Sequence, residues 1–265
     1  TNPAIDPLML PADGSYTLEV GWYGDAPPRP YRLSTTVVEP QALTLGETIP
    51  EIFDRRELWR FEGQAGNEVT IGVTAATKTA DATLSLFDAT GTLLTSVDDP
   101  EEGVRDPELS TFLPADGEYF VKVGWNGDAA PFALATSVQA PAPLALGDTV
   151  RAPAGGQPNW QFDGRAGNVV TFALSALDPD GDALLTLYDS DLVALSVSDN
   201  FDGLNPRISA ILPETGPYIL RVGWNGTPDA YTLETSAGAP AALTYGQTVA
   251  VGSADAPVWQ FEGLS

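Results

Sequence analysis

The sequence predicts an all-β protein built from tandem antiparallel β-sandwich modules of about 100 residues each. Three observations predict this fold. Short sequence words return in the same order at that interval, apolar residues alternate with polar ones between them, and 26 Gly and 23 Pro punctuate the 265-residue chain. Because no segment keeps apolar residues at helical spacing over three turns, we expect short strands and turns in place of helices.

A turn word introduces the clearest predicted strand of each copy. Leu-Pro-Ala-Asp-Gly occurs at 10–14 and 113–117, and Leu-Pro-Glu-Thr-Gly occurs at 212–216. A segment with apolar residues at every second position follows each word: Tyr16, Leu18, Val20 and Trp22; Tyr119, Val121, Val123 and Trp125; Tyr218, Leu220, Val222 and Trp224. Strict period-two alternation predicts a strand with one buried face and one solvent-facing face.

A second set of words marks where each copy starts. Leu-Gly-Glu-Thr at 45–48 returns in related form at 146–149 and 245–248. The pairs Trp59 and Phe61, Trp160 and Phe162, and Trp259 and Phe261 follow these words. Because the two aromatic residues of each pair share parity, we expect them to point into the core.

These words divide the chain into four parts. Residues 1–38 form the C-terminal part of an incomplete module, 39–138 and 139–238 form complete modules, and 239–265 form the N-terminal part of another incomplete module. A copy of this length can bury a hydrophobic core of its own.

The words of the first complete copy follow one another in a fixed order: Leu-Gly-Glu-Thr at 45–48, Trp-Arg-Phe at 59–61, Ala-Gly-Asn at 65–67, Leu-Ser-Leu-Phe-Asp at 84–88, Asp98-Asp99, and Leu-Pro-Ala-Asp-Gly-Glu-Tyr at 113–119. This order resembles the bacterial pre-peptidase C-terminal domain. The resemblance implies a jelly-roll-like β-sandwich related to the collagen-binding modules of collagenases. It also implies a non-catalytic role in adhesion, targeting or spacing within secreted proteases and surface proteins.

Composition excludes several classes of partner. The chain has 36 acidic and 12 basic residues and a net charge of -24, which repels nucleic-acid phosphates and anionic lipid headgroups. The lack of a run of 18 apolar residues argues against membrane insertion. Because cysteine is absent, core packing or metals must replace disulfides, as in many bacterial surface repeats. The resemblance to modules of secreted proteases and surface proteins implies an extracellular or cell-surface, secreted location.

Catalytic residue sets are missing from the sequence. Without histidine or cysteine, the chain has no Ser-His-Asp or Cys-His arrangement. Paired carboxylates for glycoside hydrolysis need a defined separation in a cleft, and 36 acids guarantee chance pairs. The sequence thus predicts a protein that is not an enzyme and requires no cofactor.

Acidic loops are the candidate calcium sites. The candidate ligands are Asp98, Asp99, Glu101 and Glu102 in the first copy, and Asp178, Asp180, Asp182 and Asp199 in the second. Their carboxylates are the hard oxygen ligands that Ca²⁺ prefers, although the stretch from Asp178 to Asp182 does not match an EF-hand loop. A solvated acidic loop is the simpler interpretation of both stretches.

Aspartates also recur beside the predicted core strands. Asp81 and Asp182 precede one strand in the two complete copies, and Asp88 and Asp189 follow it. Because a carboxylate can accept backbone N–H bonds at the end of a strand, we expect these residues to cap turns. Metal binding is the alternative role for the same carboxylates.

Tryptophans close the alternating segments, in words such as Gly-Trp-Asn-Gly. The candidate ligand-binding residues are Trp22, Trp125, Asn126, Trp224 and Asn225. An indole at the end of a hairpin can stack on a sugar ring or on a side chain of a partner. Each tryptophan is also in phase with the buried residues of its strand, which predicts a place at the rim of the core. Both interpretations stay open.

These features favour a non-catalytic structural or adhesive repeat segment of a long extracellular surface protein or filament. Its incomplete modules would pair end to end with neighbouring copies or with further repeats of the same chain, since unpaired strand edges add strands readily. The alternative is a substrate-binding or carbohydrate-binding accessory region of a secreted hydrolase. The partner would then be an extracellular polysaccharide or protein.

Overall fold

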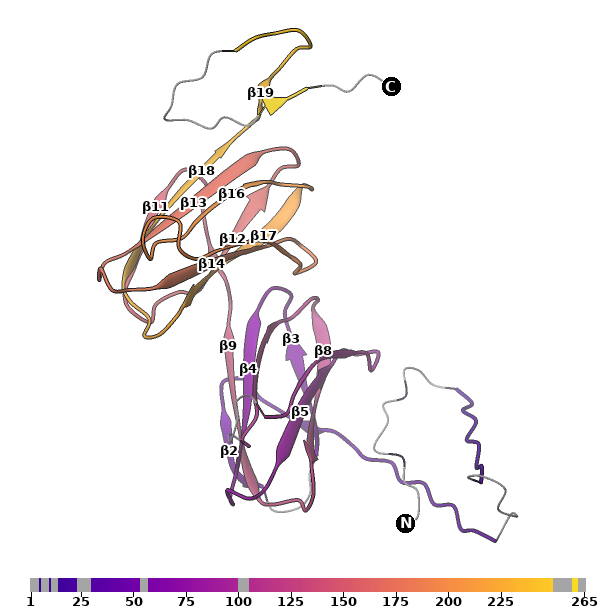
Figure 1. Ribbon diagram of the computed structural model, residues 1–265. Coiled ribbons are helices and arrows are strands. Elements are labelled where there is room, and N and C mark those ends of the chain that lie inside the picture. Colours follow the sequence, from indigo (N-terminus) through magenta and orange to yellow (C-terminus); the bar gives the residue numbers. More distant parts are fainter. Residues whose placement is uncertain are drawn as a thin grey trace. The chain divides into compact units, whose positions relative to one another are not determined.

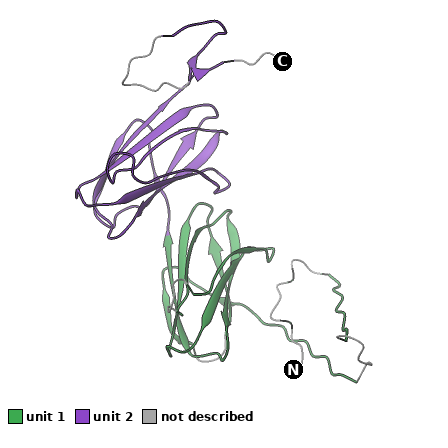
Figure 2. Ribbon diagram, viewed as in Figure 1, with its two compact units in different colours: residues 1–138 green, residues 139–265 purple. Residues whose placement is uncertain are grey.

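The computed structural model describes residues 5, 10, 14–22, 30–52, 57–99, 105–249 and 259–261. The chain divides into two compact units, residues 1–138 and 139–265 (Figure 2). Strands make up all the regular secondary structure of the described residues (Figure 1). This confirms the predicted all-β fold. In that part of the chain, no helix is long and apolar enough to cross a membrane.

Unit 1 is a β-sandwich of two sheets. Its strands are β1 (Gln41–Ala42), β2 (Thr48–Ile52), β3 (Leu58–Gly63), β4 (Glu68–Ala75), β5 (Ala82–Phe87), β6 (Leu93–Val97), β7 (Glu108–Phe112), β8 (Gly117–Trp125) and β9 (Phe132–Gln139). One sheet has the order β1-β3-β8-β5-β6 and the other β2-β9-β4-β7. The antiparallel pairs are nested: β5 with β6, β4 with β7, β3 with β8, and β2 with β9. A long hairpin folded over in this way is a jelly roll.

Unit 2 repeats the arrangement of unit 1. Its strands are β10 (Ala142–Pro143), β11 (Thr149–Ala152), β12 (Asn159–Gly164), β13 (Val169–Ala176), β14 (Ala183–Tyr188), β15 (Ala194–Ser198), β16 (Arg207–Ile211), β17 (Gly216–Trp224) and β18 (Tyr231–Gly238). The sheets have the orders β10-β12-β17-β14-β15 and β11-β18-β13-β16. Two further short strands, β19 (Ala241–Ala242) and β20 (Trp259–Gln260), pair in parallel, as β1 pairs with β3 and β10 with β12.

Each unit has a hydrophobic core of its own, filled by alternate side chains of its strands. The inward-facing residues of β8 and β17 are at most 3% exposed: Tyr119, Val121, Val123, Tyr218, Leu220 and Val222. Trp59 and Trp160 are also buried, as their parity predicted. Burial of one such side chain stabilises the fold by about 1.5–3 kcal/mol, which explains why no disulfide is needed.

A tyrosine fixes the turn that leads into β8. The hydroxyl of Tyr119 donates a hydrogen bond to the carbonyl oxygen of Ala115 at 2.7 Å and accepts one from its N–H at 3.1 Å. The ring of Tyr119 stacks on Phe61 with 5.5 Å between centroids. Gly63 lies against this ring, because a Cβ at Gly63 would come within 2.9 Å of Tyr119 Cε2 and would overlap Leu113. Unit 2 repeats the arrangement with Tyr218, Glu214, Phe162, Gly164 and Leu212.

Asp88 caps the turn from β5 into β6. Its Oδ1 accepts hydrogen bonds from the hydroxyl of Thr90 at 2.7 Å, the N–H of Thr90 at 2.8 Å and the N–H of Thr92 at 2.9 Å. The bond from the Thr90 hydroxyl is the main reason why the pKa of Asp88 lies below its ordinary value. Asp189 accepts from the N–H groups of Asp191 and Val193 in unit 2. Turn capping is therefore confirmed at both positions.

The outer segments differ from the expectation. Residues 14–22 form no strand, and their alternate apolar side chains are exposed: Tyr16 51%, Leu18 45%, Val20 41% and Trp22 40%. Their counterparts in β8 are buried because β3 and β5 flank β8, whereas no described strand pairs with residues 14–22. Phe261 is 58% exposed where we expected it to point inward. In the described part of this segment, only the short pair β19 and β20 surrounds it.

Substitution of Gly63 tests the packing of the tyrosine turn. Gly63→Ala is expected to lower the free energy of unfolding by about 1–3 kcal/mol, because the added methyl group overpacks against Tyr119 and Leu113. Urea denaturation measures the change. Gly72→Ala in β4 is the matched control, since its Cβ would meet the side chain of Glu108 at 3.5 Å or more. Equal losses in the two variants would contradict the packing argument.

The lowered pKa of Asp88 predicts a pH-dependent contribution to stability. Its carboxylate stabilises the fold above the unfolded pKa of about 3.9, and this stabilisation is lost as pH falls through the lower folded pKa. We expect Asp88→Ala to lose about 1 kcal/mol of unfolding free energy near neutral pH. Denaturation curves recorded at a series of pH values should show the wild type and the variant converging in acid. A difference that is the same at every pH would refute the role of the carboxylate.

Candidate functional site

An acidic cluster lies at one end of the sheet that contains β5, β6 and β8. Asp81 immediately precedes β5, Asp98 and Asp99 follow β6, and Asn126 follows β8. Because β5 runs antiparallel to both β6 and β8, the start of β5 meets the ends of the other two strands. One carboxylate oxygen from each of the three aspartates lies within 4.8 Å of the others.

Nitrogen donors surround this cluster. The side-chain amide of Asn126 donates to the two carboxylate oxygens of Asp98 at 3.0 and 2.9 Å, and to Oδ1 of Asp81 at 3.5 Å. The guanidinium of Arg105 lies 3.5 Å from Asp81. These donors offset part of the repulsion among the three carboxylates. The carboxylate oxygens are also the ligand type that Ca²⁺ prefers.

Unit 2 holds a thinner version of the cluster. The N–H of Asn225 donates to the carbonyl oxygen of Asp182 at 2.8 Å, as that of Asn126 does to Asp81. Its side-chain amide lies 3.4 Å from Oδ1 of Asp199. Oδ1 of Asp182 is buried and has no hydrogen-bond partner among the described residues. A buried carboxylate oxygen without a partner is costly, and Asp81, the counterpart in unit 1, has partners in Asn126 and Arg105.

The structure distributes the predicted calcium ligands unevenly. It brings Asp98 and Asp99 together and adds Asp81, for which the sequence predicted a role in turn capping. Glu101 and Glu102 lie outside the described residues.

The second candidate calcium stretch, around Asp178 and Asp180 in unit 2, forms a turn. Asp178 Oδ1 accepts from the N–H of Asp180 at 3.0 Å, and the N–H of Asp178 donates to Asp229 at 2.6 Å. Within the ranges that the structure describes, Asp178 and Asp180 do not join Asp182 and Asp199 in a group of three acids. The recurrence of Asp81 as Asp182 and of Asn126 as Asn225 is the sequence signal for the cluster, although the sequence favours turn capping for Asp81 and ligand binding for the two asparagines.

The tryptophans at the ends of β8 and β17 lie at the rims of the cores. Trp125 is half-buried, packs against the core of unit 1 and makes an edge contact with Phe132 at 5.6 Å between centroids. Trp224 packs in the same way beside Tyr231 at 6.2 Å. Trp22 is 40% exposed and contacts Tyr31 at 6.3 Å. Trp125 and Trp224 therefore each combine a core contact with a partly open surface.

The hydroxyl of Tyr231 is tied to its neighbours in unit 2. It accepts a hydrogen bond from Trp160 Nε1 at 2.9 Å and donates one to the carbonyl oxygen of Gln157 at 2.6 Å. Burial raises the pKa of Tyr231, with the bond from Trp160 acting in the opposite direction. Phe132 is the counterpart of Tyr231 in unit 1, and its side chain has no hydroxyl group.

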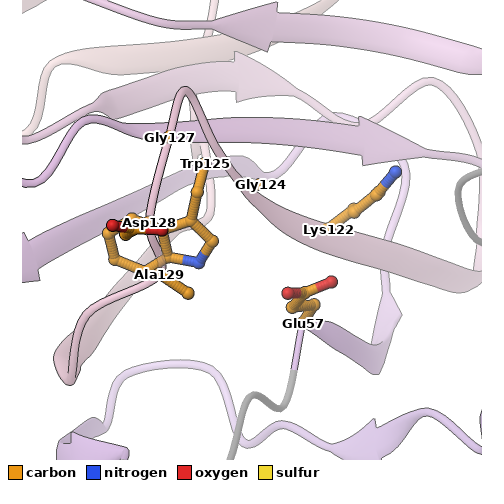
Figure 3. Close-up of a pocket in the computed structure, with 7 residues that line it drawn as sticks. All are labelled: Glu57, Lys122, Gly124, Trp125, Gly127, Asp128 and Ala129. Carbon is orange, nitrogen blue, oxygen red and sulfur yellow. The ribbon is translucent and has the colours of Figure 1, made fainter. Parts of the chain in front are cut away.

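An open pocket of about 320 Å³ lies beside Trp125 in unit 1 (Figure 3). Its lining residues are Glu57, Lys122, Gly124, Trp125, Gly127, Asp128 and Ala129. The pocket thus combines an indole with carboxylates and an ammonium group. The sequence pointed to Trp125 alone, because Glu57 and Asp128 have no acidic counterparts in the second copy.

The match to a family model covers part of unit 1. Residues 55–124 match the model of the bacterial pre-peptidase C-terminal domain. A search of curated proteins by sequence gives no match.

Several solved structures resemble the chain weakly. A structure of the M60 catalytic domain with the CBM51-1 and CBM51-2 domains from Clostridium perfringens ZmpB has 6% identity and a TM-score of 0.26, over 73% of this chain. The chain spans 38% of that structure's length. The CBM22-1-CBM22-2 tandem domain from Paenibacillus barcinonensis Xyn10C has 10% identity and a TM-score of 0.22, over 68% of this chain and 82% of that one. Empty particles of cowpea mosaic virus have 9% identity and a TM-score of 0.21, over 74% and 85%.

TM-scores of this size do not establish a shared fold. The family match agrees with the word order of the first complete copy and supports a non-catalytic accessory module. Residues 55–124, from the approach to β3 to the penultimate residue of β8, therefore match the bacterial pre-peptidase C-terminal domain in sequence.

Proposed function

We propose that the chain is a non-catalytic structural and adhesive repeat segment of an extracellular surface protein or filament. The family match supports an accessory role, and the lack of histidine and cysteine removes the commonest nucleophile–base pairs. Each of the two jelly rolls has a core of its own, which supports a role as tandem modules.

The exposure of residues 16–22 carries the structural part of the proposal. Leu18 and Val20 are 45% and 41% exposed, while their counterparts Val121 and Val123 in β8 are fully buried. A row of alternate apolar residues left in water costs free energy that a partner sheet recovers. The segment therefore has the composition of a central sandwich strand and lacks, among the described residues, the strands that cover one.

The parallel pair β19 and β20 offers the matching surface. It repeats the pairing of β1 with β3 and of β10 with β12, and in each complete unit the third strand of that sheet is β8 or β17. Residues 14–22 carry the sequence pattern of β8. If residues 14–22 were added as a strand beside β20, the three strands would repeat the orders β1-β3-β8 and β10-β12-β17 of the complete units. The partner is a neighbouring copy or a further repeat of the same chain.

Sedimentation velocity over a range of protein concentrations tests the pairing between copies. We expect concentration-dependent association that Leu18→Asp together with Val20→Asp abolishes, because buried charges oppose strand addition. Thr17→Asp is the control, since Thr17 alternates with these residues and would lie on the opposite face of the added strand. Wild-type protein that stays monomeric at about millimolar concentration would contradict pairing between copies. Hydrolysis of a protein or polysaccharide substrate by the chain would contradict the non-catalytic role.

An accessory binding region of a secreted hydrolase is the second candidate. The pocket beside Trp125 favours it, because an indole with convergent polar groups is a usual binding surface for small ligands. The same pocket would serve an adhesive repeat.

Calcium binding at the cluster of Asp81, Asp98 and Asp99 is a further part of the proposal. Its support is the convergence of three carboxylates within 4.8 Å. An ion that binds only the folded state stabilises that state by mass action, by about 2.7 kcal/mol at a hundredfold excess over Kd.

A calcium titration followed by thermal unfolding tests this part. We expect Tm to rise with millimolar calcium and to fall again with a chelator. The rise should disappear in Asp98→Asn and persist in Glu47→Gln, which removes one exposed acid of the same unit. An unchanged Tm in the wild type would rule out the site.

A further inference from the structure

We propose that the pocket beside Trp125 in unit 1 binds a pyranose ring of an uncharged polysaccharide. The inference rests on the adhesive role proposed above and gives it a ligand class. The pocket, at about 320 Å³, lies at the lower end of the range for small-molecule sites. It therefore suits one or two sugar rings of a longer chain and not a large folded partner.

Trp125 supplies a fixed aromatic surface. Its contact with Phe132 and with the core of unit 1 holds the indole in place. Because the ring is only half-buried, part of it lines the pocket (Figure 3). The apolar C–H groups of a pyranose ring pack on such a surface, and little entropy is lost because the indole is already ordered.

Polar side chains line the pocket together with the indole. Glu57 and Lys122 lie to one side of Trp125, and Asp128 overlaps the indole in this view (Figure 3). Glu57 is anchored through its backbone, since its carbonyl oxygen accepts the N–H of Val123 at 2.8 Å. Carboxylates accept hydrogen bonds from hydroxyl groups, and such charge-assisted bonds are about twice as strong as neutral ones. The arrangement matches a ring that is apolar on its face and rich in hydroxyl donors at its edge.

The net charge of the chain favours uncharged polysaccharides over acidic ones. A net charge of -24 repels uronic acids and sulfated glycans. Two carboxylates and one ammonium group line the pocket itself. An uncharged ring avoids the repulsion and still uses both carboxylates as acceptors.

Unit 2 lacks these acids around its own tryptophan. Pro158 occupies the place of Glu57, as the bond from the N–H of Val222 to the carbonyl oxygen of Pro158 at 2.7 Å shows. Thr227 replaces Asp128 in the hairpin after β17. The structure therefore assigns the proposed ligand to unit 1.

Calorimetric titration of the whole chain with cellohexaose and with fully acetylated chitohexaose tests the inference. We expect saturable binding of at least one hexasaccharide, and an affinity that changes less than about twofold between low and high salt, because no charge is exchanged. Glu57→Gln and Asp128→Thr should each weaken binding by about five- to tenfold. Neither change touches a core residue, so both variants should fold. Trp125→Phe, which keeps the core contact, should weaken binding by a similar factor.

Asp163→Asn in unit 2 is the charge-matched control and should leave the affinity unchanged. Absence of saturable binding of either hexasaccharide to the wild type would overturn the inference. Equal affinity in Glu57→Gln, Asp128→Thr and the wild type would also overturn it. Binding of a lysine-rich peptide in place of the sugars, lost at high salt, would identify the pocket as an acidic peptide site and overturn it too. The proposed pairing between copies is tested separately, because sedimentation velocity in the absence of sugar measures that assembly alone.

Discussion

The placement of β8 between β3 and β5 is the constraint on which the rest of unit 1 depends, and β17 has the same place between β12 and β14 in unit 2. One face of β8 supplies Tyr119, Val121 and Val123 to the core. The hydroxyl of Tyr119 closes the turn that leads into β8, and Trp125 is the last residue of β8. β8 therefore contributes to the core and also places the two candidate ligand sites, the acidic cluster and the pocket, at the same end of the sheet.

The two units keep the core and vary the loops around it. Phe61 on Tyr119 and Phe162 on Tyr218 stack at the same 5.5 Å, and Gly63 and Gly164 leave room for the same rings. Away from the core, the acidic cluster loses members and the acids around the tryptophan disappear. Because loops tolerate substitution better than packed strands do, duplication of a module leaves one copy free to carry a ligand site while both keep the fold.

The sequence was sufficient for the fold and for the burial of both cores, because period-two alternation records directly which side chains face inward. It was also sufficient for Asp88 and Asp189, whose role depends only on the next few residues of the chain. It was not sufficient for residues 14–22, where alternation alone predicted a buried strand. Burial requires a partner sheet, and a strand's own residues do not encode whether that partner is present.

The acidic cluster and the pocket show the same limit. Asp81, Asp98 and Asn126 come from three strand ends that only the sheet order brings together. The pairing of β3 with β8 brings Glu57 to the pocket that Trp125 lines, whereas Asp128 follows Trp125 in the same loop. Each acid is unremarkable in its own stretch of a chain with 36 of them. Spatial convergence of distant segments is information that periodicity and spacing do not carry.

The nested pairing of strands also determines when a module can fold during synthesis. The outermost pair joins Thr48 to Ala135 in unit 1 and Thr149 to Glu234 in unit 2, so each sandwich closes only after its last strand has left the ribosome. Contacts this distant in sequence form slowly. The innermost pair, β5 with β6, is the most local and can form first. Unit 1 can thus finish closing while unit 2 is still being made, which keeps two sets of strands with the same topology from pairing with each other.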